Sequence, residues 1–105
     1  MENNAPFEVE ILPAAQKDLK VLKPHEAQAI RAVLKLENDP MLGHVLQGSL
    51  RGVRALEFNL KGGGTYRAVD TIPGSDRVCV VFLVGPHENI YQTAERRWTA
   101  LRKRL

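Results

Sequence analysis

The chain has 105 residues, 44% of them hydrophobic, and its 15 Lys and Arg against 12 Asp and Glu give a formal net charge of +3. A chain of this length builds a core without disulfide or metal support, so residues 1–105 are expected to form a single domain. A multidomain enzyme and a long repeat array are therefore excluded. The apolar share is too high for a disordered chain, and the longest apolar run, Val78 to Val84, is too short to span a bilayer.

The polar N-terminus lacks the apolar stretch of a secretory signal, so we expect residues 1–6 to be a flexible leader and the protein to be cytoplasmic. The single cysteine, Cys79, lies in the most apolar segment, where a thiol behaves as a small buried hydrophobe.

Charge is distributed unevenly along the chain. Residues 1–40 carry 5 basic and 7 acidic side chains, a net −2, whereas residues 41–105 carry 10 basic and 5 acidic ones, a net +5. Such asymmetry indicates a polyanionic partner, although an acidic protein partner fits the same surface.

The first part of the chain predicts one strand and a helical hairpin. Residues 7–11 alternate apolar and acidic side chains with period two, as a half-buried strand does. Residues 13–23 begin with proline and repeat apolar side chains at helical spacing, and residues 24–38 form a second helix that ends before Pro40. Residues 41–52 hold three glycines and no sustained period, which predicts a connecting loop.

The second part predicts three strands and a last helix. Apolar and polar side chains alternate in residues 56–60, and a second strand is predicted at residues 66–72. The glycine triplet at 62–64 between them predicts a hairpin turn; the alternative is that its backbone N–H groups contact a phosphate. Residues 78–84 are apolar on both parities, which indicates a central strand covered on both faces. Residues 92–105 predict a basic helix whose apolar stripe places Trp98 in the core.

The resulting order, β-α-α-β-β-β-α, predicts an α+β fold: a small antiparallel sheet with an N-terminal helical hairpin and a C-terminal basic helix. We expect the helices to pack on one face of the sheet and to leave the other face for function. No set of residues has the spacing of a zinc site, a nucleophilic triad or a cofactor motif, so no metal and no cofactor are expected.

The candidate site residues lie in the basic part of the chain. Arg67 sits in the middle of a strand, where it either pairs with Glu57 or Asp70 across strands or clamps a phosphate. His87 follows the buried strand and suits a general acid or base, or is simply an exposed loop residue. Tyr91 and His44 are weaker candidates, read on their own as a packing aromatic and a loop residue.

Three short motifs occur in a characteristic order along the chain. They are Leu46-Gln-Gly48, the strand Tyr66-Arg67-x-Val69, and Val84-Gly85-Pro-His-Glu-Asn-Ile-Tyr91 before a basic terminal helix. With this order and spacing, the chain from about Phe7 to Arg97 resembles the RelE/ParE superfamily of bacterial type II toxins. The resemblance implies a RelE-like fold and a ribosome-dependent mRNA endonuclease held inactive by a cognate antitoxin. The implied chemistry needs no metal: a base assists attack of the 2′-hydroxyl on the adjacent phosphate, cations stabilise the phosphorane, and an acid protonates the leaving 5′-oxygen.

The resemblance also assigns roles. Arg67 matches the strand arginine that clamps the phosphate, Tyr91 matches the tyrosine beside the substrate base, His87 falls where a proton donor is expected, and His44 lies where some relatives place a base. Phosphates of RNA are expected to meet a further basic set: Arg51, Arg54, Lys61, Arg96 and Arg97.

One departure keeps other functions open. Where RelE has a pair of strand lysines, this chain has Ala55 and Glu57, so only Arg54 or Lys61 can substitute. The ParE branch of the superfamily shares the fold and poisons DNA gyrase without cutting. The alternatives are thus a gyrase-poisoning binding module, or a degenerate toxin that acts mainly with its antitoxin in transcriptional autoregulation. For each of these functions we expect an antitoxin as partner, contact with operator DNA only through that antitoxin, and no binding to a membrane. If the protein is a nuclease, the ribosome and mRNA are further partners.

Overall fold

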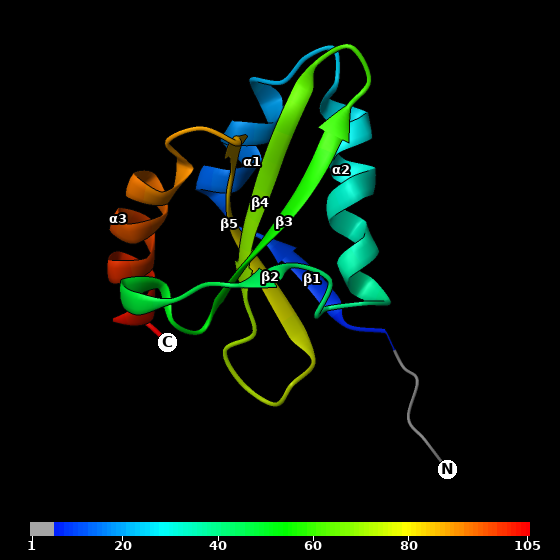
Figure 1. The fold of residues 1–105 in the computed structure, drawn as a ribbon. Coiled ribbons are helices and arrows are strands. Elements are labelled where there is room, and N and C mark those ends of the chain that lie inside the picture. Colours follow the sequence, from blue (N-terminus) through cyan, green and yellow to red (C-terminus); the bar gives the residue numbers. More distant parts are fainter. Residues whose placement is uncertain (1–5) are drawn as a thin grey trace.

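The computed structural model describes residues 6–105, which form a five-stranded sheet with helices on both of its faces (Figure 1). The expected flexible leader lies, apart from Pro6, outside the described residues. The elements in chain order are β1 (Glu8–Ile11), α1 (Pro13–Lys20), α2 (Glu26–Leu34), the 3₁₀ turn η1 (Lys35–Glu37), β2 (His44–Val45), the 3₁₀ turn η2 (Gly48–Leu50), β3 (Val53–Leu60), β4 (Gly64–Thr71), β5 (Val78–Pro86) and α3 (Ile90–Arg102). The predicted order of the main elements is confirmed.

The strands are arranged in the order β1-β5-β4-β3-β2, and the sheet is mixed. β1 runs parallel to β5, with Glu8 opposite Val78 and Ile11 opposite Val81, while the other pairs are antiparallel. The expectation of a wholly antiparallel sheet was therefore wrong in this one pair. β1 and β5 are far apart in the chain, so no hairpin sets their relative direction, and alternation of side chains does not specify it.

The core has two parts, one on each face of the sheet. On one face, α1 and α2 pack over a first cluster that includes Leu19, Val33 and Cys79. On the other, α3 and η2 pack over a second cluster that includes Phe82 and Trp98. The expectation that all helices share one face was wrong, whereas the expectation that residues 78–84 are covered on both faces is confirmed. The buried positions predicted for Cys79 and Trp98 are also confirmed.

The loop expected over residues 41–52 contains a short edge strand. β2 pairs only with Arg54 and Ala55 of β3, through Val45 and His44. A Cβ atom at Gly43 would lie 2.9 Å from the Ala55 carbonyl carbon, so glycine allows the close approach that starts this pairing. Beyond Ala55, the outer edge of β3 has no strand partner among residues 6–105.

The turn between β3 and β4 is fixed to α2. The backbone N–H of Lys61 donates to Gln28 Oε1 at 3.2 Å, and the Lys61 carbonyl lies 3.0 Å from His25 Nε2. Gly62 and Gly64 adopt φ values of 76° and 93°, which favour glycine. The glycine triplet is therefore a hairpin turn, as predicted, and its end is anchored to a helix.

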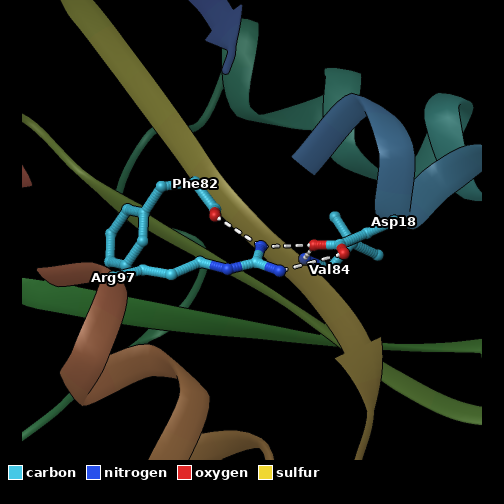
Figure 2. Close-up of polar contacts among 4 residues, drawn as sticks. All are labelled: Asp18, Phe82, Val84 and Arg97. Atoms are coloured by element: carbon cyan, nitrogen blue, oxygen red, sulfur yellow. Dashed lines mark hydrogen bonds and ion pairs between the residues drawn. The ribbon is translucent and has the colours of Figure 1, made fainter. Parts of the chain in front are cut away.

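Where β5 extends past the end of β1, an ion pair covers its edge (Figure 2). Arg97 of α3 donates to both carboxylate oxygens of Asp18 in α1, at 2.6 and 3.2 Å. The same pair binds the strand backbone, because Arg97 donates to the Phe82 carbonyl at 3.0 Å and the Val84 N–H donates to Asp18 at 3.0 Å. Two helices and a strand edge are thereby joined at one point.

Candidate active site

Arg67 lies in the middle of β4, the central strand of the sheet. It is opposite Glu57 on β3 and opposite Gly85 on β5. Strand alternation places Arg67 with Val69, which packs in the cluster under α3, so Arg67 is on the α3 face. Gly85 lies against the first residue of α3, since a Cβ atom there would be in van der Waals contact with Ile90 Cδ1 at 3.6 Å.

Two side chains hold the Arg67 guanidinium. Its Nη1 donates to the Tyr91 hydroxyl, and its Nη2 lies 3.1 Å from Glu57 Oε1 as a hydrogen-bonded ion pair. The guanidinium carbon also lies 5.3 Å from the centroid of the Tyr91 ring, within cation–π range. We call Glu57, Arg67 and Tyr91 the Arg67 cluster.

The Arg67 cluster joins residues that are far apart in the sequence. Of the two cross-strand partners expected for Arg67, the structure selects Glu57. Tyr91, read on its own as a packing aromatic, remains 39% exposed and faces the arginine. Arg67 Nε is buried without a hydrogen-bond partner among the described residues, which leaves one donor of the guanidinium unused by the protein.

His87 lies two residues beyond Gly85, which is opposite Arg67. Its backbone N–H donates to the Thr65 carbonyl at 3.1 Å, so it continues the register that pairs Arg67 with Gly85. The side chain is exposed. His87 is thus exposed on the loop between β5 and α3, the helix that carries Tyr91.

Two adjoining hollows, with volumes of about 250 and 630 Å³, lie between α2 and the open edge of β3. Both are lined by Ala32, Lys35, Glu57 and Phe58. His44 lines the smaller one, and Arg31 lines the larger one. Glu57 thus borders this groove at the β3 edge, while its carboxylate is paired with Arg67 on the α3 face.

The other basic residues that were expected to bind RNA lie at different places in the fold. Arg51, Lys61 and Arg96 are exposed, on the turn before β3, on the β3–β4 turn and on α3. Arg97 is held in the ion pair with Asp18. Arg54 alternates with Glu57 along β3 and so belongs to the opposite face from Arg67.

A second polar group is buried under the other face of the sheet. Asp70 is 0% exposed, and it accepts a hydrogen bond from Cys79 Sγ at 3.3 Å. Burial raises the pKa of Asp70 to about 7, although the Cys79 hydrogen bond and the charge of Arg54 act in the opposite direction. Burial, and then the Asp70 charge, raise the pKa of the Cys79 thiol. The sequence offered Asp70 only as a possible cross-strand partner of Arg67, and no residue pattern indicated a buried carboxyl there.

Within residues 6–105, no three His, Cys, Asp or Glu side chains are grouped so as to hold a metal ion. The same residues include no helix that is long and apolar enough to cross a membrane.

Comparison with solved structures shows that the fold of this chain is similar to the folds of bacterial toxins. The toxin–antitoxin complex RelBE2 of Mycobacterium tuberculosis contains a chain that is 25% identical, with a TM-score of 0.68 and coverage of 78% of this chain and 99% of that one. A mutant of the E. coli toxin RelE in the free state is 15% identical, with a TM-score of 0.66 and coverage of 86% and 93%. The intact E. coli RelBE complex gives 18% identity, a TM-score of 0.59 and coverage of 79% and 99%.

Sequence comparison adds the family. No curated protein matches the chain. A family model does: residues 9–95 match the model described as the ParE-like toxin of type II bacterial toxin–antitoxin systems. The match spans most of the chain, and the chain belongs to the ParE-like toxin family.

Proposed function

We propose that this toxin is a ribosome-dependent endoribonuclease that cuts mRNA by metal-independent attack of a 2′-hydroxyl on the adjacent phosphate. The observation that carries the proposal is the Arg67 cluster, in which a guanidinium is fixed on a rigid strand by Tyr91 and Glu57. Charge that is fixed in advance stabilises a phosphorane more effectively than a mobile side chain does, because little reorganisation is needed.

The residues divide the reaction between them. Arg67 binds the scissile phosphate, and Tyr91, which is partly exposed above it, lies beside the substrate base. His87, exposed at the end of β5, gives a proton to the leaving 5′-oxygen. His44 and Glu57 both border the smaller hollow, and either can take the proton of the 2′-hydroxyl.

The proposed partners follow from the same surface. An antitoxin binds the toxin, and the RelBE and RelBE2 structures are toxin–antitoxin complexes of this kind. The ribosome delivers the mRNA, and exposed Arg51, Lys61 and Arg96 contact ribosomal phosphates. Operator DNA is reached only through the antitoxin, and the site of action is the cytoplasm.

Two observations favour a second candidate, a gyrase-poisoning module. The matched family is ParE-like, and the charge of Arg67 is already paired with Glu57. In that case the Arg67 cluster is a structural ion pair, and the toxin acts by binding. The Arg67–Glu57 pair is also compatible with a third possibility, a degenerate toxin that acts mainly with its antitoxin in transcriptional autoregulation.

The test is mRNA cleavage in a translating extract, with cuts mapped by primer extension. The wild-type toxin is expected to cut in register with codons, Arg67→Ala to lose cutting, and Arg102→Ala, at an exposed position of α3, to keep most of it. If mRNA stays intact with the wild-type toxin and the toxin inhibits supercoiling by gyrase, the nuclease function is wrong and the gyrase-poisoning module is the function.

A further inference from the structure

Glu57 is the carboxylate that touches Arg67, and it occupies a position where a lysine was expected from the resemblance. We propose that Glu57 is the general base that takes the proton from the attacking 2′-hydroxyl of the RNA. This inference rests on the proposed function and assigns the proton acceptor within it.

The position of Glu57 suits a base acting on a phosphate bound by Arg67. The two residues are directly opposite in the β3–β4 register, and Oε1 lies 3.1 Å from Nη2. The 2′-oxygen that attacks a phosphorus atom lies next to that phosphate within the same nucleotide. A phosphate on the guanidinium therefore brings the hydroxyl close to the neighbouring carboxylate, and both elements are strands that hold this geometry.

Glu57 is also the accessible carboxylate. Its side chain is 44% exposed, against 15% for that of Arg67, so a ribose can reach it. Asp70 is fully buried with Cys79, and Glu95 accepts a hydrogen bond from Ser49 at 2.5 Å. His44, the expected base, pairs with Ala55 and has no hydrogen bond to Arg67.

The proton transfer changes the charge that Arg67 presents. Before reaction, the guanidinium is paired with the Glu57 carboxylate. When Glu57 takes the proton it becomes neutral, so the charge of Arg67 is released at the moment when the phosphorane gains negative charge. The interaction is then stronger in the transition state than in the ground state, which is the condition for raising the rate of the chemical step.

The step balances as follows. The bond between the 2′-oxygen and phosphorus forms, and the bond between phosphorus and the 5′-oxygen breaks. The 2′-hydroxyl proton goes to the Glu57 carboxylate, and the 5′-oxygen receives a proton from the acid. The products are a 2′,3′-cyclic phosphate and a 5′-hydroxyl, and exchange with water restores both protein groups.

The experiment is single-turnover cleavage of mRNA on programmed ribosomes, followed across pH, with the full-length toxin. Glu57→Gln keeps an oxygen that accepts from Arg67 but removes the basic carboxylate. We expect its rate to fall by roughly 10²–10³-fold, the scale of a general base, with loss of the acidic limb of the pH–rate profile. Glu95→Gln is the matched control, and thermal melts check that each variant is folded.

The outcomes separate this inference from the function beneath it. If Arg67→Ala abolishes cleavage while Glu57→Gln cleaves at the wild-type rate, the nuclease stands and the assignment of the base is wrong. If His44→Ala removes the acidic limb and Glu57→Gln does not, His44 is the base and the proposal is overturned. If the wild-type toxin does not cut at all, the proposed function itself fails.

Discussion

Arg67 is held by a hydroxyl from α3 and a carboxylate from β3, and neither contact is redundant. Tyr91→Phe keeps the ring and removes the acceptor of Nη1. Since a hydrogen bond to a charged group contributes about 1.5 kcal/mol or more, we expect cleavage to fall by roughly tenfold with the fold unchanged. Tyr66→Phe, whose ring stacks on Phe58 at a centroid distance of 6.4 Å, is the control, measured in the same translating extract. Equal activity of the two variants would remove the Tyr91 hydroxyl from the account.

Asp70 is the residue whose titration affects stability. The unfolded carboxyl titrates near 3.8, and burial raises the folded pKa to about 7, so the folded state binds the proton more tightly. The contribution of Asp70 to stability is therefore fully present below about pH 4, and it is lost as pH rises through about 7, with an upper limit of roughly 4 kcal/mol.

Asp70→Asn has no proton to lose, so its free energy of unfolding is expected to depend less on pH between about 4 and 8. Urea denaturation at pH 5 and pH 8 measures the difference. Asp76→Asn, on an exposed turn, is the control that should behave like the wild type. If the wild type gains stability relative to Asp70→Asn between pH 5 and pH 8, the assigned direction is wrong.

At the scale of elements, the Asp18–Arg97 pair joins α1, α3 and the part of β5 that β1 does not cover. The two side chains are 18% and 28% exposed, so the pair is partly shielded from water. We expect Arg97→Ala to cost about 2 kcal/mol, because it leaves the Asp18 carboxylate and the Phe82 carbonyl without their partner. Arg96→Ala, on the exposed side of the same helix, should cost less than about 0.5 kcal/mol.

Hydrogen exchange gives the local measure of this contact. The Val84 amide donates to Asp18, so its protection should decrease in Asp18→Ala more than that of the Val81 amide, which lies where β1 pairs with β5. Uniform loss of protection along β5 would mean that the pair contributes only to global stability.

The elements themselves were largely predictable from the sequence. Period-two alternation, the glycine triplet and the proline breaks located the strands and the helical hairpin, because these signals are local. The partner of β1 and the placement of α3 were not predictable, since alternation shows which side of a strand is apolar and not what covers it. The buried run at residues 78–84 already indicated cover on both faces, and the structure shows α1 and α2 on one and α3 on the other.

The candidate site was predicted in part. Arg67, Tyr91 and a Glu57 partner followed from strand register and from the family resemblance, and the structure brings these three together. The Asp18–Arg97 contact was missed, because nothing in the sequence shows that α1 and α3 meet around a strand edge. Arg97 was for that reason grouped with the RNA-binding residues, although its guanidinium binds Asp18.

At the scale of the whole molecule, the positive charge of the second part of the chain reaches the surface near α3. Ser49 of η2 donates to Glu95 of α3, so exposed Arg51 and Arg96 lie on segments that contact each other. Replacing both with Gln is expected to weaken binding to 70S ribosomes and to lower the slope of log affinity against log salt by about 2. The melting temperature should change little, and an unchanged salt slope would exclude these arginines from the ribosome contact.

The central claim is that the Arg67 cluster cuts RNA by attack of the 2′-hydroxyl, and the chemistry of the product ends tests it most directly. The measurement is analysis of fragments produced on translating ribosomes, by 5′-kinase labelling and by treatment with a cyclic phosphodiesterase, for the wild type and Arg67→Ala. The account predicts 5′-hydroxyl and 2′,3′-cyclic phosphate ends from the wild type and none from the variant. Fragments with 5′-phosphate ends, or equal cutting by Arg67→Ala, would contradict it.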